Sequence, residues 1–400
     1  MVPSFDNPFR PGAGHMPPYL AGRKSEETEF RKLLKQTTIL DNLILTGLRG
    51  VGKTVLLETL KPIAIQEKWL WVGTDLSETT SVSEANFAVR ILTDLSVVTS
   101  AITLTVGEQT ATGFAGSTTP ILQSVNFDFL KRTFDETPGL VLDKLKSVLE
   151  LVWGLIKRTD RRGVIFAYDE AQNLADNSAK EQFPLSVMLD LFQSIQRKGI
   201  PFMLVLVGLP TLFPKLVEAR TFAERMFRVV ALGQLGEQDR KDAIKKPVAD
   251  ARCPIKFSES SVEVISGLSG GYPYFIQFIC REVYDLWIQK IGAGADTAIP
   301  VDAIQRKLDT DFFAGRWARA TDRQREMLFV IATLENNEGE FAVQEIVDMS
   351  QITLEKGFSS SHTNQMLLAL TNAGLVYKNR YGRYSLAVPL MAQFIKRQQN

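Results

Sequence analysis

The stretch ILTGLRGVGKTVLLETL, residues 44–60, places three glycines and a lysine between a short apolar run and an apolar helix pattern. It contains the spacing G-x-x-x-x-G-K-[ST], with the fixed positions at Gly47, Gly52, Lys53 and Thr54. This spacing is typical of a phosphate-binding loop that leaves a strand and opens a helix. Glycines permit positive φ and close approach, so successive backbone N–H groups can converge on phosphate oxygens at the electropositive start of a helix. An ordinary glycine-rich turn is the alternative.

The residues around this loop supply the context that the motif requires. Residues 42–46 read as a buried strand, and residues 55–60 read as an apolar helix face. In such a loop Lys53 reaches the β- and γ-phosphates, and the Thr54 hydroxyl is offered to Mg²⁺. We therefore predict that ATP and Mg²⁺ bind here. The expected cofactor-binding residues in the loop are Gly47, Gly50, Val51, Gly52, Lys53, Thr54 and Val55.

A second informative segment is GVIFAYDEAQNL, in which four apolar residues lead through Tyr168 to Asp169 and Glu170 at a predicted strand end. This is a Walker B pattern. The carboxyl ends of parallel strands face the ligand crevice, so Asp169 can hold Mg²⁺ and Glu170 can polarise a water that attacks the γ-phosphate. Alone, the pair is typical of a solvated strand end. As a later strand of a domain that already has a phosphate loop, it indicates hydrolysis.

Composition narrows the class of protein. The 400 residues predict two or three domains, and 45% hydrophobic and 23% charged residues are typical of a globular chain. A net charge of +1 means that nucleic-acid binding would need a local basic patch. The few cysteines and histidines lack metal-ligand or redox spacing, so we expect neither zinc nor histidine catalysis; they are Cys253, Cys280, His15 and His362.

No signal-peptide core and no run of about 18 apolar residues is present, so we expect a soluble cytoplasmic protein without membrane contact. The composition and the order of the predicted helices and strands divide the chain into four parts. These are an extended proline-rich arm (1–22), an α/β nucleotide-binding domain (23–235), a helical domain (236–300) and a terminal domain (301–400). Ser25 is the predicted N-cap of the first helix. Residues 99–137 are consistent with either a hairpin or a mobile insertion.

The terminal domain has the predicted order helix, helix, helix and hairpin, which is the order of a winged helix-turn-helix. Its third helix begins with the polar residues of 361–365 and has no arginine or lysine on its first turns, so guanine readout by that helix is not expected. Its hairpin interleaves basic and aromatic residues that suit phosphate contacts. These are Lys378, Arg380 and Arg383 with Tyr377, Tyr381 and Tyr384.

In five features the chain resembles the AAA+ ATPases. The resemblance is to the branch around the archaeal origin-recognition initiators, which is related to the signal-transducing STAND class. The features are the phosphate loop, the Asp169–Glu170 pair, ERMF (224–227), GGYPYFIQ (270–277) and the terminal domain. The resemblance covers roughly residues 17–400. It implies an α/β fold with a five-stranded parallel P-loop sheet, a helical lid, and ATP hydrolysis completed at a subunit interface.

The resemblance also implies roles for single residues. LAGR, residues 20–23, is similar to a segment that contacts the adenine, so Arg23 is a further cofactor-binding candidate and the arm would be ordered by nucleotide. Arg225 matches the arginine finger, which acts on the nucleotide of a neighbouring subunit in a homo-oligomer and can supply ~10³ to 10⁵ in rate. Arg220 is the second candidate for this role. A surface residue at a helix end is the alternative for Arg225.

Two departures from the family pattern indicate slow turnover. The run of residues 200–210 is predicted to be the fourth buried strand, and it ends in the apolar residues VGLP, 207–210, where the family often has a polar sensor residue. The lid has Pro273 where many members have a second sensor arginine. Similar replacements occur in the STAND-like branch and fit a slow ATPase that works as a switch.

Three functions follow from these observations. In the first, nucleotide state controls oligomerisation and the binding of double-stranded DNA through residues 359–384. In the second, a STAND-like switch, the winged helix binds a protein effector. In the third, the protein binds nucleotide without turnover, which the presence of Glu170 disfavours.

Overall fold

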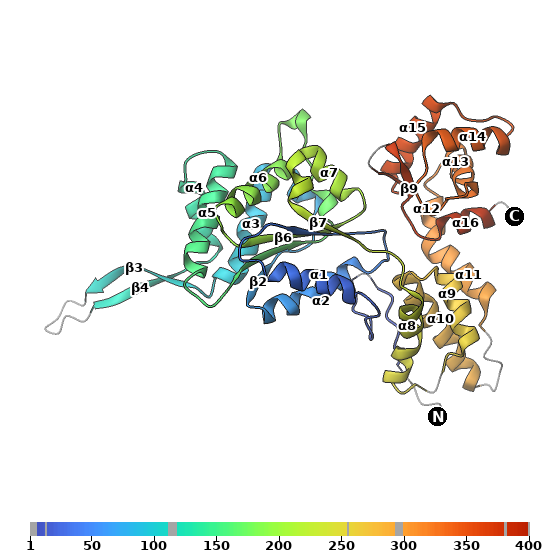
Figure 1. The fold of residues 1–400 in the computed structure, drawn as a ribbon, viewed down its shortest axis with the longest axis horizontal. Helices are drawn as coiled ribbons and strands as arrows, with labels where there is room; N and C mark the ends of the chain where they lie inside the picture. The colour runs from blue at the N-terminus through green and yellow to red at the C-terminus, as the bar shows by residue number, and fades with distance from the viewer. Residues whose placement is uncertain are drawn as a thin grey trace. The chain divides into compact units, whose positions relative to one another are not determined.

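Three apolar runs of the sequence form adjacent parallel strands in the middle of a five-stranded sheet (Figure 1). They belong to a computed structural model that describes residues 6–12, 14–110, 118–253, 256–292, 299–379 and 382–398. The sheet has the order β2-β5-β6-β1-β7. Its strands are β1 (Asn42–Thr46), β2 (Trp69–Val72), β5 (Gly163–Tyr168), β6 (Phe202–Gly208) and β7 (Phe227–Ala231). The predicted five-stranded P-loop sheet is confirmed.

The register of β6 brings two functionally important strand ends to one edge. Thr46 of β1 pairs with Gly208, and Tyr168 of β5 pairs with Leu206 on the other side of the same strand. Gly47 follows Thr46 directly, and Asp169 follows Tyr168. Both sequence motifs therefore start at the carboxyl edge of the sheet, where ligands of parallel sheets bind.

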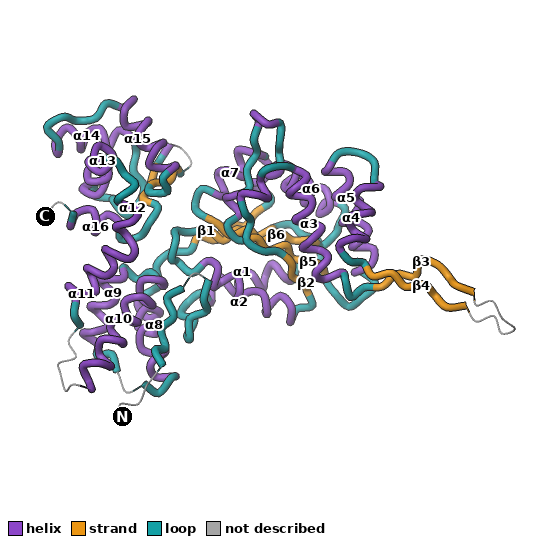
Figure 2. The backbone as a smooth tube through the Cα atoms, turned by 180° about the vertical axis from the view of Figure 1, so that it is seen from behind, coloured by secondary structure: helices purple, strands orange, loops and turns teal. Residues whose placement is uncertain are grey.

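Burial on both faces explains why these strands read as continuous apolar runs. Every residue of β1, β5 and β6 is buried, as expected for parallel strands that helices cover on both sides. Helices α1 (Lys24–Leu34) and α2 (Lys53–Gln66) cover one face, and α3 (Glu84–Thr99), α5 (Val141–Ile156) and α6 (Pro184–Arg197) cover the other (Figures 1 and 2). Phe166 packs edge-on against Phe192, with ring centroids 5.0 Å apart, and so joins sheet to helix.

Two local predictions need comment. Helix α1 begins at Lys24, so the prediction of Ser25 as its N-cap is wrong: Ser25 lies in the first turn, and its Oγ donates to Glu26 Oε2 at 2.6 Å. The insertion contains an antiparallel hairpin of β3 (Thr103–Thr110) and β4 (Thr118–Ser124), followed by α4 (Phe127–Glu136). The hairpin alternative is therefore correct for the described part of this segment; residues 111–117 lie outside it.

After β6 the chain forms α7 (Leu212–Ala219), the 3₁₀ turn η4 (Thr221–Arg225) and β7, and then becomes helical. The helices of the predicted lid, called the lid helices below, are α8 (Glu237–Asp250), α9 (Glu259–Ser269) and α10 (Pro273–Gly292). They lead through α11 (Val301–Leu308), the π-helix η5 (Asp309–Ala314) and α12 (Gly315–Trp317) to the terminal domain. That domain has the predicted order, with α13 (Asp322–Thr333), α14 (Val343–Thr353), α15 (Ser360–Asn372), β8 (Val376–Lys378) and β9 (Tyr384–Leu386), and it ends in α16 (Met391–Arg397). Its assignment as a winged helix stays a prediction.

The chain forms two compact units. The sheet unit comprises Lys24–Thr46 and Leu56–Val230, and the helical unit comprises Met1–Arg23, Gly47–Val55 and Ala231–Asn400. Within the helical unit the described part of the N-terminal arm has no helix or strand and packs on the lid helices. Phe9 is 2% exposed and meets Phe257 edge-on at 6.0 Å, while Asn7 Nδ2 donates to Asp285 Oδ1 at 2.7 Å. Protein contacts therefore hold the arm.

Candidate active site

The glycines of the phosphate loop sit where a side chain would be strained or would clash. Gly50 and Gly52 have φ of +83° and +86°, in the left-handed region that side chains disfavour. A Cβ on Gly47 would lie 2.5 Å from the Leu232 carbonyl oxygen, and one on Gly50 would lie 3.1 Å from Tyr274 Cβ. Helix α2 begins at Lys53. The structure therefore requires glycine at these positions, and phosphate binding by the loop stays a prediction.

Backbone carbonyls of this loop are held by the lid and by Arg23. Gly50 O accepts from Tyr274 N at 3.1 Å, and Val51 O accepts from Arg23 Nη2 at 2.9 Å. The same Arg23 nitrogen donates to Gly233 O at 2.8 Å. The Arg23 guanidinium therefore fastens the loop to the segment that enters the lid. The nucleotide contact expected of Arg23 stays a prediction.

Lys53 and Thr54 follow the loop on the first turn of α2. Lys53 Nζ donates to Gly47 O at 2.9 Å and to Leu48 O at 3.0 Å, so the ammonium is directed at the loop that it is predicted to serve. Thr54 lies beside the arm, with its Cγ2 3.3 Å from the position of a Cβ on Gly14. An ammonium with three donors on a flexible stem can exchange carbonyl partners for phosphate oxygens.

In the sheet unit, Asp169 and Glu170 leave β5 with different surroundings. Asp169 is 4% exposed, its Oδ1 accepts from Glu170 N at 2.7 Å, and its carbonyl accepts from Leu76 N at 2.9 Å. Glu170 is exposed and has φ of +49°. A left-handed conformation costs a non-glycine residue about 1–2 kcal/mol, and such positions cluster at functional sites. The turn thus presents the Glu170 carboxylate to solvent and keeps the Asp169 carboxylate inside.

Two residues that the sequence interpretation missed join this pair. The backbone of Asp75, which follows β2, forms an isolated parallel β-bridge with the backbone of Asp169. The exposed Asp75 side chain adds a second carboxyl group at the sheet edge. The Gln172 amide donates from Nε2 to Glu170 Oε2 and accepts at Oε1 from Leu209 N at 3.1 Å. The strand end at 207–210 has no polar side chain, as predicted, but Gln172 brings one there. The only sequence signals are a carboxylate after a second strand and an amide two residues after Glu170.

The turn that carries these residues is held by a half-buried lysine and by a buried carboxylate behind the strand. Lys215 Nζ donates to Gln172 O at 2.6 Å, and burial lowers the pKa of Lys215 although Asp176 and Glu218 oppose the shift. Behind β5, Tyr168 donates its hydroxyl to Asp94 Oδ2 at 2.9 Å. Burial raises the pKa of Asp94, against the opposing effects of Arg90 and Tyr168.

The two arginine-finger candidates differ in their contacts. Arg220 makes a bidentate ion pair with Asp190, with its Nε and Nη2 at 2.9 Å and 2.8 Å from the carboxylate oxygens, and this pair raises the pKa of Arg220. Arg225, at the end of η4, is exposed, and its guanidinium has no hydrogen bond or ion pair to any residue that the structure describes. A bidentate pair would have to break before Arg220 could act elsewhere, which favours Arg225.

The donor set fits Mg²⁺ bound mainly through phosphates. Mg²⁺ prefers hard oxygen ligands and is usually held by one or two carboxylates together with phosphates and waters. The predicted ligands, the Asp169 carboxylate and the Thr54 hydroxyl, are of this hard oxygen type. In the sheet unit, the buried Thr46 Oγ1 at the end of β1 lacks a hydrogen-bond partner among the described residues. Within those residues no group of three histidine, cysteine or acidic side chains could hold a metal on its own.

The described residues of the terminal hairpin reduce the predicted phosphate-contacting set. Tyr384 is 8% exposed, so the expectation that it contacts phosphate is wrong: it packs inside the domain, and its backbone pairs with Phe341. Tyr377 is half-buried. Lys378 and Arg383 are exposed, and Arg383 Nη1 lies 3.5 Å from Glu345 Oε1. The predictions for residues 380 and 381 lie outside the described residues.

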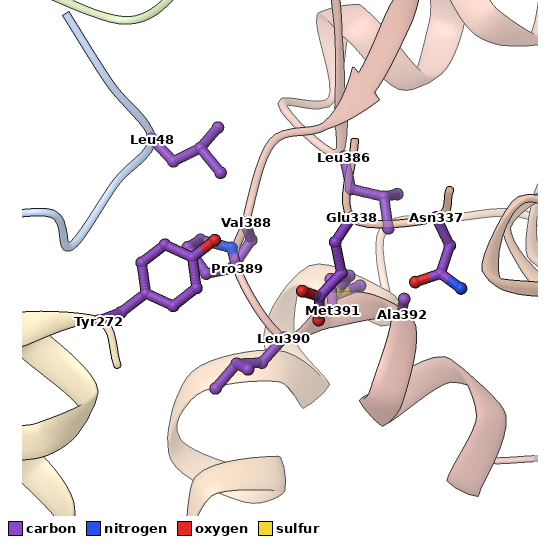
Figure 3. Close-up of a pocket in the computed structure, with 10 residues that line it drawn as sticks. All are labelled: Leu48, Tyr272, Asn337, Glu338, Leu386, Val388, Pro389, Leu390, Met391 and Ala392. Carbon is purple, nitrogen blue, oxygen red and sulfur yellow. The ribbon is translucent and has the colours of Figure 1, made fainter. Parts of the chain in front are cut away.

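A pocket in the helical unit offers a different chemistry (Figure 3). Leu48 of the phosphate loop and Tyr272 of the lid line it together with residues around Leu390. Its lining is largely apolar, and its charged member is Glu338, which would repel a phosphate. This pocket therefore does not suit a nucleotide.

No helix in the described part of the chain has the length and apolarity needed to cross a bilayer.

Comparison with known proteins identifies the fold. The Walker-type ATPase PABY2304 of Pyrococcus abyssi superimposes with a TM-score of 0.55 at 14% identity, over 94% of this chain and 96% of that one. Cdc6p from Pyrobaculum aerophilum superimposes with a TM-score of 0.46 at 14% identity, over 97% of this chain and 98% of that one. The Aeropyrum pernix ORC2 protein superimposes with a TM-score of 0.45 at 14% identity, over 96% of each chain.

The predicted resemblance is thereby confirmed for the fold, which is of the AAA+ ATPase type. Identity of 14% extends this conclusion to architecture and not to function. Residues 310–395 match a family model described as a domain of unknown function, DUF8462. A search of curated proteins found no match.

Proposed function

We propose that this protein is a Mg²⁺-dependent ATPase of the AAA+ type whose nucleotide state acts as a switch. The observation that carries the proposal is the presence in one chain of two motifs: a loop with positive φ at Gly50 and Gly52, which directly follows β1, and the pair Asp169 and Glu170, which directly follows β5. Each motif alone occurs in other settings. Together, in a chain that contains a five-stranded parallel sheet, the two motifs provide the groups that phosphoryl transfer requires.

The chemistry assigned to each residue follows from its surroundings. The loop N–H groups and Lys53 bind the β- and γ-phosphates, and Thr54 and Asp169 would hold Mg²⁺, which neutralises charge on the phosphates when it is bound. The exposed Glu170 carboxylate orients and deprotonates the attacking water. We assign metal binding to the buried Asp169 because its Oδ1 accepts from the Glu170 N–H, and this hydrogen bond fixes the position of the carboxylate.

Hydrolysis is completed in trans by Arg225 of a second copy of the chain. An exposed guanidinium without a partner in the described residues can enter a neighbouring site without breaking an ion pair, unlike Arg220. The oligomer would therefore be the active form, and the monomer would turn over slowly.

The terminal domain supplies the output. In the first candidate function it binds double-stranded DNA through the exposed Lys378 and Arg383. One observation favours a second candidate, a protein effector: Ile352 at the end of α14 and Leu368 on α15 are 82% and 64% exposed, and exposed apolar side chains are typical of protein-binding surfaces.

ATP turnover measured across a range of protein concentrations, with and without duplex DNA, tests these proposals. Specific activity that rises with protein concentration, and that Arg225→Ala abolishes, supports a finger in trans. Arg220→Ala serves as the matched comparison. Stimulation by DNA that falls steeply with added salt supports the DNA candidate, because phosphate contacts release counterions. Absence of turnover at every concentration would contradict the enzyme proposal, whereas DNA-independent turnover favours the protein effector.

A further inference from the structure

Gly208, at the end of β6, lies against the side-chain amide of Gln172. A Cβ on Gly208 would lie 2.5 Å from Gln172 Oε1, closer than real contacts allow. The glycine therefore makes room for the Gln172 side chain. Leu209, the next residue, donates its N–H to the same Oε1 at 3.1 Å.

This contact fixes which way the amide faces. A glutamine amide has one accepting end and one donating end. Rotation by 180° would place Nε2 against the Leu209 N–H and Oε1 against the carboxylate of Glu170, and both contacts would be repulsive. The donor Nε2 is therefore directed at Glu170 Oε2, as the structure shows.

The backbone beneath the amide is also held. Lys215 Nζ donates to Gln172 O at 2.6 Å from α7, and Asn173 Nδ2 donates to Leu76 O at 2.9 Å beside the end of β2. Gln172 is half-buried, whereas the Glu170 side chain is exposed. Among the described residues, the Gln172 amide is the side-chain donor that holds the Glu170 carboxylate.

We propose that Gln172 is the positioning residue of hydrolysis: its amide ties the Glu170 carboxylate to the end of β6, so that this strand end sets the orientation of the general base. The proposal rests on the proposed ATPase function. A free glutamate side chain distributes over several rotamers, and a base displaced by about 1 Å can lose up to ~10²-fold in rate. Gln172 thus supplies the polar group that residues 207–210 lack.

Isosteric substitution separates this role from packing. Gln172→Glu keeps the length and the oxygen that accepts from Leu209 N–H, and it replaces the donor with a second carboxylate oxygen beside Glu170. We expect kcat to fall about 10- to 10²-fold while KM for ATP stays within about twofold.

Two further variants complete the test. Gln182→Glu is the matched control, because Gln182 is also half-buried and accepts at Oε1 from a backbone N–H, that of Glu84. Its kcat and its KM for ATP should stay at the wild-type values. Gly208→Ala displaces the amide without changing residue 172, and should reproduce the loss of kcat with ATP binding retained.

Loss of kcat in Gln172→Glu and Gly208→Ala, with normal ATP affinity and an unchanged Gln182→Glu, supports the proposal. Wild-type kcat in Gln172→Glu would overturn it and leave the ATPase assignment intact, provided that Glu170→Gln is inactive. An inactive wild-type protein would overturn the ATPase assignment and the role of Gln172 together.

Discussion

The phosphate loop and the turn after β5 are both predicted to act on one nucleotide, yet they are held in different ways. The loop depends on backbone: positive φ at Gly50 and Gly52, and carbonyls bound by Arg23 and Tyr274. The turn depends on side chains from segments far apart in sequence, such as Lys215 on α7. The loop should therefore be sensitive to an added Cβ, and the turn to lost polar groups.

Removal of the base should have the largest effect. Glu170→Gln keeps the size of the side chain but cannot accept a proton from water, so we expect kcat to fall by about 10² to 10⁴ with ATP affinity retained. Single-turnover hydrolysis and equilibrium ATP binding measure the two quantities. Glu181→Gln is a close control, because Glu181 is an exposed glutamate in the same connection that also has a left-handed backbone, with φ of +51°. Normal turnover in Glu170→Gln would remove the turn from the catalytic machinery.

Loss of the loop cation should have the next largest effect, on binding instead of on the chemical step. Lys53→Ala removes charge-assisted hydrogen bonds worth about 1.5–3 kcal/mol each, so ATP affinity should fall about 10- to 10²-fold. Lys61→Ala, an exposed lysine two turns further along α2, should bind normally. Equal affinities of the two variants in a titration would separate the loop from nucleotide binding.

The contrast between the regions also explains what the sequence could predict. The phosphate loop is a contiguous motif whose glycines and lysine are expected to act through local geometry, so its residues and the strand before it could be read from the sequence, and the resemblance implied the five-stranded sheet. Gln172 and Asp75 could not, because their roles arise when β6 and β2 are placed beside β5. Ser25 shows a further limit: a good capping residue stands one position inside the observed helix start.

A test of backbone sensitivity compares glycines in different conformations. Gly52→Ala should lower the thermal midpoint and weaken ATP binding by about 1–2 kcal/mol, since alanine is strained at φ of +86° although the space is open. Gly50→Ala should cost more, because its Cβ also meets Tyr274 at 3.1 Å. Gly154→Ala, within α5 and with open space around it, should stabilise by about 0.5–1 kcal/mol. A neutral result at Gly50 and Gly52 would contradict the loop geometry.

The smallest effect is expected from the lysine that supports the turn, and it should depend on pH. Burial lowers the pKa of Lys215, so between that lowered value and the usual lysine value the folded protein has lost a proton that the unfolded chain still binds. The free energy of unfolding contributed by this group therefore rises with pH across that alkaline window. Lys215→Met should remove the rise, while Lys180→Met, which replaces an exposed lysine between β5 and α6, should retain it. Urea midpoints measured from neutral to alkaline pH compare the two variants. Parallel curves for wild type and Lys215→Met would mean that the half-buried ammonium is as well solvated as a surface one, and that the turn is held by its other contacts.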